Sequence, residues 1–200
     1  MRLYQRISIS SMLAFLLVTV ASFSLKGELN NTKFYSSNLD ISIKGTSSLH
    51  DWEMKSNKGK CEVEFVLGAN DKISGISDLK FNLDATTIKS EYTMMDNNTY
   101  KALKTKSNKN ISFALVSGTV TQSDATSYLV KVIGNLTIAG KTQKIDLAGT
   151  AKQNADKSLT VTGSKKLKMT DYGVDPPTAM FGTIKTGNDI TISFTTKIVK

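Results

Sequence analysis

The chain has 200 residues, of which 40% are hydrophobic, and a formal net charge of +9. That length suits one domain with its own core, and the lone cysteine, Cys61, excludes an intramolecular disulfide and a thiolate metal cluster. His50 is the only histidine, so a zinc site built on several imidazoles is excluded too. Both arginines, Arg2 and Arg6, lie at the start of the chain, and their absence elsewhere argues against sequence-specific nucleic-acid recognition.

Residues 1–24 have the pattern of a secretory signal peptide. A basic start precedes an apolar run over residues 12–21, and small residues follow the run. The run is well short of the ~20 residues that a membrane-spanning helix needs. We therefore expect export, cleavage after Ala21 or Ser24, and no transmembrane segment after cleavage.

The chain from residue 37 to residue 200 is expected to form one β-rich domain. A polar, unpatterned stretch at residues 25–36 predicts a flexible leader in front of it. In the first part of the domain, apolar residues alternate with polar ones, which is the period of a strand with one solvated face. Turn residues at Lys58-Gly59 and at 68–71 separate these stretches. The expected strands cover residues 39–44, 52–55, 61–67 and 79–88.

A short helix is predicted between Met94 and Thr105, where the strand pattern stops. Asp96 or Asn97 can cap its first turn. The spacing of apolar and polar residues gives this helix one apolar side and one polar side. Its apolar side is formed by Met95, Thr99, Tyr100 and Leu103, and its polar side by Asn98, Lys101 and Lys104.

Strand periodicity resumes after the helix, over residues 111–115, 128–138, 145–147, 159–169 and 190–199. Ala139-Gly140-Lys141 predicts a tight hairpin turn. Pro176 and Pro177 exclude strand pairing from the centre of the segment 165–194, so a loop there joins two strands. We expect this loop to fold back over a hydrophobic opening, because it carries the apolar residues Tyr172, Val174, Ala179, Met180 and Phe181.

Eight or nine strands at short spacing, without alternating helices, indicate an antiparallel sandwich or a closed barrel. We favour the barrel, because closure leaves no exposed sheet edge. An eight-stranded barrel is just wide enough to be filled by side chains or to hold one slender ligand. The predicted fold class is therefore all-β, a single antiparallel eight-stranded barrel with one short helix.

Three features match chemical motifs only formally. The segment 138–142 ends like a phosphate-binding loop, but Asn135 stands where the first glycine should be and a strand follows. His50 and Asp51 would act as a base and its orienter only if their side chains met, whereas adjacent strand residues diverge. Cys61 lies on the apolar phase of its strand, so we expect a buried, unreactive thiol.

Seven short motifs follow one another through the domain: TTIKS at 86–90, MD at 95–96, YKALK at 100–104, ISF at 111–113, GNLTIAGKT at 134–142, KLKMTDYG at 166–173 and FGT at 181–183. Their order and spacing resemble the YceI-like family of exported, lipocalin-like barrels, over about residues 37–200. The resemblance implies a helix against one side of the barrel and an apolar lumen that binds a polyisoprenoid or similar amphiphile in the periplasm. It implies no catalytic residues, metal or cofactor. The pair His50-Asp51 departs from the glycine-rich hairpin that many members have there.

We therefore expect a periplasmic or secreted protein, not an enzyme, that carries a polyisoprenoid or other lipid and binds no nucleic acid. One alternative is a barrel filled by its own side chains, serving as a structural or interaction module in a stress response or at the cell surface. Another is an enzyme that uses His50. Lysines at 101–109 and 165–168 are expected to be solvated, with contact to a phosphate head group as the alternative. The oligomeric state stays open, with a homodimer among the alternatives.

We predict that the ligand contacts apolar side chains of the lumen and of the proline-containing loop. Phe65, Phe81, Phe113 and Met180 in particular are expected to line the channel. The full set of predicted contact residues is Trp52, Met54, Phe65, Leu67, Phe81, Leu83, Met95, Tyr100, Leu103, Phe113, Leu115, Val130, Val132, Met169, Tyr172, Met180 and Phe181.

Overall fold

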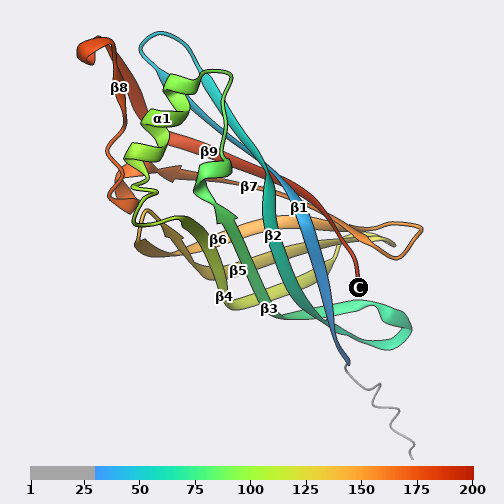
Figure 1. Cartoon of the computed structure of the whole chain (residues 1–200). Helices are drawn as coiled ribbons and strands as arrows, with labels where there is room; N and C mark the ends of the chain where they lie inside the picture. The colour runs from blue at the N-terminus through green and yellow to red at the C-terminus, as the bar shows by residue number, and fades with distance from the viewer. Residues whose placement is uncertain (1–29) are drawn as a thin grey trace, which may run out of the picture.

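The structure of the protein is a computed structural model that describes residues 30–200. The predicted signal peptide at residues 1–24 lies outside the described residues. Eight long strands pair antiparallel around a closed barrel, because the last strand pairs back to the first (Figure 1). In order around the barrel they are β1 (Asn30–Ser47), β2 (Trp52–Leu67), β3 (Ile73–Asp84), β4 (Asn110–Gln122), β5 (Ser127–Ile138), β6 (Lys141–Gln153), β7 (Leu159–Lys168) and β9 (Ile184–Ile198). This arrangement confirms the predicted fold class.

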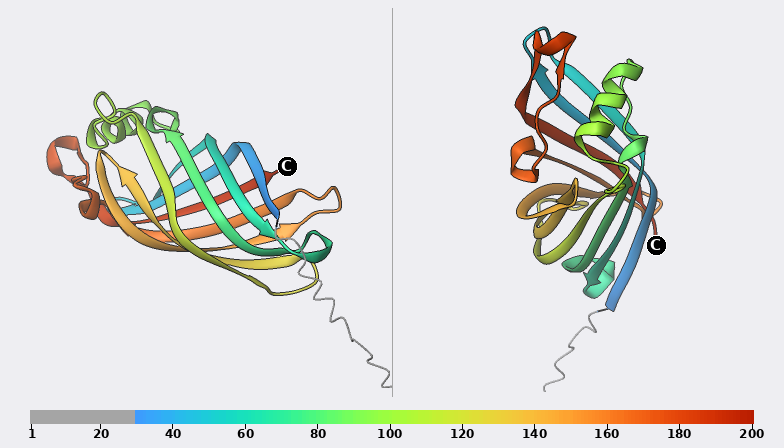
Figure 2. Two further views of the ribbon diagram at one scale, coloured as in Figure 1. Left: turned by 90° about the horizontal axis from the view of Figure 1, so that it is seen from below. Right: turned by 60° about the vertical axis from the view of Figure 1, so that its left-hand side comes forward.

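The remaining elements are short and gather mainly at one end of the barrel. The helix α1 (Thr93–Ala102) and the two-residue strand β8 (Thr178–Ala179), which pairs with β9, both lie there (Figures 1 and 2). Four 3₁₀ turns complete the described elements: η1 (Ala69–Asp71), η2 (Ala85–Thr87), η3 (Met169–Tyr172) and η4 (Met180–Gly182). The helix and the hairpin turn at Ala139-Gly140 were both predicted, and the structure has both.

The strand β1 begins earlier than the sequence indicated. It starts at Asn30, inside the segment predicted as a leader, and pairs there with the end of β2. Phe34 explains the extension, because it is buried and its ring meets that of Phe65 edge-on, with centroids 5.8 Å apart. Phe34 and Tyr35 are adjacent and stand among polar residues, so the segment has no alternation from which to predict a strand.

The strand β2 runs without a break through Gly59, where the sequence suggested a turn. Gly59 is buried, and a Cβ atom there would lie 3.1 Å from atoms of both Leu39 and Phe81. This glycine therefore permits close packing between strands instead of reversing the chain. The predicted strand 79–88 is also shifted, because β3 starts at Ile73 and gives way to η2 after Asp84.

The two ends of the barrel differ in how they are filled. At the end away from α1, large side chains from both halves of the sheet pack into one cluster. Its buried members are Phe34, Val63, Phe65, Leu67, Ile73, Tyr128, Ala151, Leu159 and Ile198. The expectation of a barrel filled by its own side chains therefore holds for this end.

At the other end, three strands extend beyond their neighbours. The pairing of β2 with β3 ends at Lys60 and Asn82. The earlier part of β2, back to Trp52, pairs with only one long strand, β1. The loop before α1 covers the free side, because Lys55 and Lys89 exchange two backbone hydrogen bonds of 2.7 and 2.8 Å. The extensions of β1, β2 and β9 thus form a half-open wall that faces α1 (Figure 1).

The reactivity of Cys61 provides a test of this packing. Burial, together with the neighbouring Glu62 charge, raises the pKa of the thiol to about 12, and the thiolate is the reactive form. We expect the folded protein to react with Ellman's reagent at mildly alkaline pH more than about a hundredfold more slowly than the unfolded protein. The same reaction in guanidinium chloride is the control. Equal rates in the two conditions would show that Cys61 is accessible.

Candidate functional site

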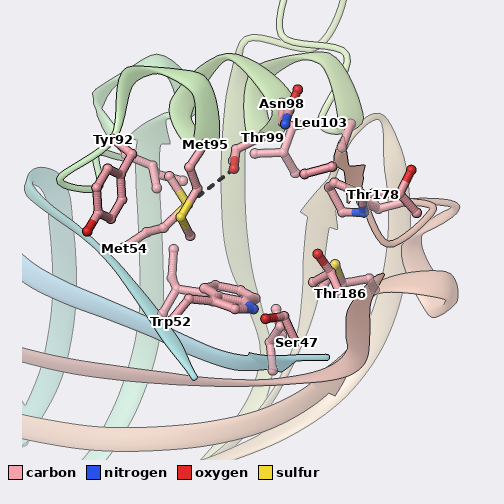
Figure 3. A pocket seen from close by; sticks show the side chains of 18 of the residues that line it. Ser47, Trp52, Met54, Tyr92, Met95, Asn98, Thr99, Leu103, Thr178 and Thr186 are labelled. Atoms are coloured by element: carbon pink, nitrogen blue, oxygen red, sulfur yellow. Dashed lines mark hydrogen bonds between the residues drawn. The ribbon is translucent and has the colours of Figure 1, made fainter. Parts of the chain in front are cut away.

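A cavity of about 450 Å³ lies at the α1 end, between the helix, the extended strands and the segment that leads to β8 (Figure 3). Its wall is overwhelmingly apolar. Sites for small organic ligands are apolar concavities of about 300–1,000 Å³ with a few polar groups, so the size and the lining both fit such a site. The innermost part of the wall comes from the barrel itself, through Ile111, Ile138, Ile190 and Ile192.

Trp52 forms one side of the cavity, at the start of β2. It pairs with Gly45 on β1, and any side chain at Gly45 would overlap the indole ring. The indole N–H donates to the backbone oxygen of Thr46 at 2.9 Å. The glycine and this hydrogen bond together hold the ring across β1, so that Trp52 and the neighbouring Met54 cover the cavity wall (Figure 3).

The helix α1 forms the opposite side. Met95, Thr99 and Leu103 line the cavity, as the periodicity of an amphipathic helix requires. The Thr99 hydroxyl donates to the Met54 sulfur at 3.2 Å, which links the helix to β2 across the site (Figure 3). Asn98, predicted on the polar side, also lines the cavity, because the cavity contacts more of the helix surface than its apolar side alone.

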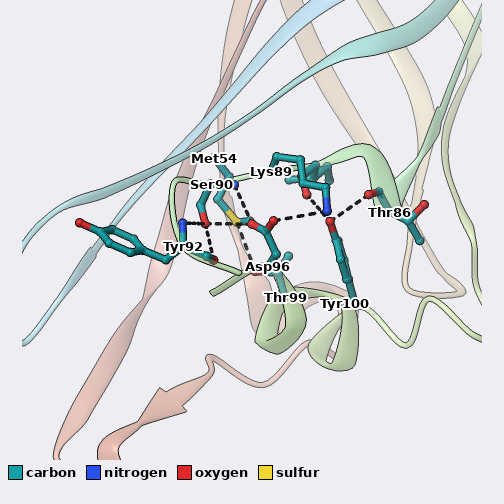
Figure 4. A network of polar contacts seen from close by, with 9 residues as sticks. Met54, Thr86, Lys89, Ser90, Tyr92, Asp96, Thr99 and Tyr100 are labelled. Atoms are coloured by element: carbon teal, nitrogen blue, oxygen red, sulfur yellow. Dashed lines mark hydrogen bonds and ion pairs between the residues drawn. The ribbon is translucent and has the colours of Figure 1, made fainter. Parts of the chain in front are cut away.

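A buried carboxylate fixes the loop that leads into α1. Asp96 accepts hydrogen bonds from the backbone N–H and the hydroxyl of Ser90, at 2.7 and 2.8 Å, and pairs with Lys89 at 3.4 Å (Figure 4). Burial acts to raise the pKa of Asp96, but these contacts outweigh it, so the pKa lies below its ordinary value. The sequence suggested that Asp96 or Asn97 caps the helix. Instead, α1 starts after Tyr92 without a side-chain cap, because Asp96 is engaged with Ser90.

Tyr100 holds the same loop from one turn further along the same side of the helix. Its hydroxyl lies 2.9 Å from the backbone oxygen of Thr86 and 2.8 Å from that of Ile88, and donates between them. The Lys89 ammonium lies 5.0 Å from the centre of its ring. Tyr100, predicted as a ligand contact, therefore anchors the loop and lies outside the cavity wall.

The third side of the cavity comes from the proline-containing segment after β7. Val174, Pro177 and Ala179 line it, together with Tyr172 from η3. Tyr172 is 3% exposed, and its hydroxyl is the one buried side-chain oxygen or nitrogen in residues 30–200 without a hydrogen-bond partner. Burial raises the pKa of Tyr172 to about 12, so the hydroxyl keeps its proton at neutral pH. The site thus contains an unused hydrogen-bond donor in an apolar wall.

The predicted contact residues are divided between the cavity and the filled part of the barrel. Those that line the cavity are Trp52, Met54, Met95, Leu103, Met169 and Tyr172. Phe65 and Leu67 lie in the cluster at the closed end, and Phe81, Leu83, Phe113, Leu115, Val130 and Val132 pack in the barrel core. These side chains alternate inward as predicted, but they sit too deep in the barrel to reach the cavity.

The proline-containing segment lies against the opening only in part. Val174 and Ala179 line the cavity, whereas Met180 and Phe181 are exposed and are not among its lining residues. Both are among the contact residues predicted from the sequence. The strand pairing of Thr178 and Ala179 with β9 explains the difference, because it ends the inward part of the segment just before Met180.

Several cavity residues were not among those predicted, including Ile43, Ile88, Ala102 and the four isoleucines of the barrel wall. Alternation marks the strand residues as inward-facing, but it does not tell their height along the barrel. That height follows from the strand register, in which Trp52 lies opposite Gly45 at the open end. Proximity to the ends of strands next to the helix is the signal that would have identified them.

His50 lies at the opening of the cavity and is exposed. Its Nδ1 is 2.6 Å from the backbone oxygen of Asp51, not from the Asp51 carboxylate, so the two side chains form no base-and-orienter pair. Within residues 30–200, no group of three or more His, Cys, Asp or Glu side chains is placed to hold a metal ion. None of the helices in this part of the chain is long and apolar enough to span a membrane.

Replacement of Asp96 tests whether its contacts hold α1 in place. We expect Asp96→Asn to lower the free energy of unfolding by about 1–3 kcal/mol at neutral pH, since a buried charged acceptor is lost. A carboxylate with a lowered folded pKa stabilises the fold above its unfolded pKa of 3.8, and the contribution disappears as the pH falls through the folded pKa. The two proteins should therefore differ fully at neutral pH and converge in stability as the pH is lowered from there to well below 3.8.

Urea denaturation across this pH range measures the effect. Asp40→Asn, at an exposed position on β1, is the matched control and should change stability little at any pH. A deficit for Asp96→Asn that persists unchanged in acid would mean that its charge is not what stabilises the loop.

A family model described as a YceI-like domain matches residues 36–198. Among solved structures, BcnA from Burkholderia cenocepacia is 17% identical, with 81% of this chain and 96% of that chain covered and a TM-score of 0.63. A polyisoprenoid-binding domain from Saccharophagus degradans, implicated in plant cell wall breakdown, is 10% identical, with 86% and 98% covered and a TM-score of 0.60. The YCEI protein of Campylobacter jejuni is 18% identical, with 74% and 84% covered and a TM-score of 0.56. At these identities the likeness shows the fold. No curated protein matches the chain.

Proposed function

The chain belongs to the YceI-like family, and from that premise we propose that it binds a polyisoprenoid or a similar amphiphile in the cavity at the α1 end. The observation that carries the proposal is the apolar cavity of about 450 Å³ between α1 and the extended strands. A structural relative described as a polyisoprenoid-binding domain supports the same ligand class. The proposed role is to hold and carry the lipid, without a chemical step.

The volume of the cavity bounds the length of chain that it can enclose. At about 30 Å³ for each water-sized group in a liquid, about 450 Å³ holds about 15 carbon-sized groups. Each buried methylene contributes about 0.8 kcal/mol, against an association cost of at least about 4 kcal/mol. About 15 buried methylenes thus contribute about 12 kcal/mol, which exceeds the lower bound of that cost. A longer polyisoprenoid would leave part of its length outside the cavity, because the other end of the barrel is filled.

Tyr172 is the residue that we expect to orient the ligand. Its buried hydroxyl is protonated and has no partner among the described residues, so a shift of the wall on binding would let it donate to an oxygen of the ligand. A buried polar group without a partner costs about 1–3 kcal/mol, and a ligand oxygen would remove that cost. The ligand would accordingly carry a hydroxyl, carbonyl or other acceptor oxygen that enters the cavity.

We place the action of the protein after export, in the periplasm or outside the cell. The support is the N-terminal sequence, in which a basic start and a short apolar run precede small residues. A lipid carrier suits such a compartment, because an isoprenoid chain needs a protein cavity to cross water between membranes.

Binding can be followed by the fluorescence of Trp52, which is the only tryptophan and lines the cavity. Farnesol and longer polyprenyl alcohols should displace water from the indole and shift its emission to shorter wavelength. Affinity should rise with chain length up to about 15 carbons and then level off. Ala102→Phe should weaken binding about tenfold or more, since the added ring occupies cavity volume.

The matched control is Ala125→Phe, at an exposed position in the turn between β4 and β5. It adds the same ring outside the cavity and should leave the affinity unchanged. Equal effects of the two substitutions, or no spectral response to any polyprenyl alcohol, would contradict the proposed site.

Tyr172→Phe should change stability and binding in opposite directions. Without ligand, the variant should be more stable by about 1 kcal/mol or more, because it loses only an unpaired buried hydroxyl. With farnesol, it should bind about tenfold more weakly, because the hydrogen bond to the ligand oxygen is gone. Thermal unfolding with and without farnesol measures both effects. A hydrocarbon of equal length, such as farnesane, serves as the control ligand and should bind the wild type and the variant equally well. If the variant binds both farnesol and farnesane more weakly, the substitution has distorted the cavity wall and the proposed hydrogen bond is not the cause.

A further inference from the structure

The opening of the cavity is surrounded by apolar side chains that face solvent. Five of the nine large hydrophobic side chains that are exposed among the described residues lie at this end. Leu49 belongs to the turn after β1, Tyr92 and Met94 lie at the start of α1, and Met180 and Phe181 lie in η4. Figures 1 and 2 show these three tips projecting from the same end of the barrel. We call these five residues the rim.

The η4 part of the rim is held in an unusual backbone conformation. Met180 and Phe181 have φ angles of 49° and 55°, and Gly182 follows at 89°. Residues other than glycine rarely adopt this left-handed backbone conformation, because their Cβ atom then comes too close to the carbonyl oxygen. Phe181 is fully exposed, so no packing in the folded chain offsets this strain. A strained turn that presents Met and Phe to water indicates a contact outside the molecule.

The chemistry and placement of the rim fit a lipid bilayer. Aromatic residues and long apolar side chains anchor peripheral proteins by entering the boundary between head groups and acyl chains, to a depth of about 5–10 Å. The rim consists of separate tips, as such insertion needs, and three of its residues also line the cavity: Leu49, Tyr92 and Met94. A surface seated on the rim would therefore face the cavity opening.

Charge favours an anionic surface at long range. The full chain carries a net charge of +9, of which Arg2 and Arg6 contribute two, so the part after residue 24 carries +7, and lysine provides all of its basic groups except His50. Lys168 and Lys185 lie beside the opening and form no ion pair within residues 30–200. The three exposed carboxylates Asp51, Glu91 and Asp175 outnumber these two lysines at this end. The whole molecule thus supplies the attraction to anionic lipid, and insertion of the rim must supply the attachment.

We propose that the rim docks on an anionic lipid bilayer, with Met180 and Phe181 inserted among the head groups. The cavity opening then lies against the membrane, and a lipid passes between the two without crossing bulk water. Docking itself is independent of the ligand site, and only the transfer of lipid into the cavity rests on the proposed function.

Flotation with vesicles of phosphatidylethanolamine and phosphatidylglycerol tests the docking. The protein is taken from its own cells, and mass spectrometry first verifies that its N-terminus begins after the apolar run, which would itself bind vesicles. We expect the wild type to float with the vesicles. The double variant Met180→Ser, Phe181→Ser should bind the vesicles at least about tenfold more weakly. Val116→Ser, which removes an exposed apolar side chain from β4, is the matched control and should float like the wild type.

The Trp52 response to farnesol should be retained in the double variant, since Met180 and Phe181 do not line the cavity; this shows that the variant is folded. The proposal is overturned if the wild type does not float, or if the double variant floats as well as the wild type. It is also overturned if light scattering shows a dimer that the double variant breaks, because the rim is then a contact between two copies. Rim-dependent flotation without any farnesol response would support docking while removing the proposed ligand.

Discussion

The pairing of β9 with β1 is the constraint on which the rest of the structure depends. Once the sheet closes, every inward side chain of eight strands meets the others inside a barrel just wide enough to be filled. The sequence fills one end with aromatic and branched side chains. At the other end, β1, β2 and β9 continue past their neighbours, so closure is incomplete there and a helix must supply the missing wall. The cavity results from this difference between the two ends.

The position of α1 depends on polar contacts as much as on apolar ones. A helix of ten residues has little stability of its own, so its packing must hold it. Asp96 and Tyr100 fix the loop before it, and Thr99 reaches the sulfur of Met54 across the site. These groups are satisfied inside the protein. Tyr172 is the exception, and its unsatisfied buried hydroxyl needs an explanation, which the proposed ligand oxygen would provide.

Much of the fold could be predicted from the sequence, because a period of two in hydrophobicity follows directly from the pleat of a half-buried strand. The strands of the barrel were predicted from this alternation. The helix and the Ala139-Gly140 hairpin were predicted from other local signals, the spacing of a helix and the residues of a tight turn. The site was harder to predict. Phe65 and Trp52 carry the same inward-facing signal on β2, yet Phe65 fills the closed end and Trp52 lines the cavity. Register between distant strands sets that difference, and alternation along one strand does not encode it. Met180 and Phe181 show the reverse case, where apolar character suggested burial but pairing with β9 turns them outward.

The central claim is that the cavity at the α1 end holds a lipid in the cell. The most direct measurement is native mass spectrometry of the protein isolated from its own cells, followed by organic extraction and identification of the released molecule. We expect one polyisoprenoid or similar amphiphile per protein, with an acceptor oxygen, and its loss from Ala102→Phe. A protein that is free of lipid as isolated, and that also takes up no added polyprenyl lipid, would contradict the claim and favour a barrel that acts through its surface alone.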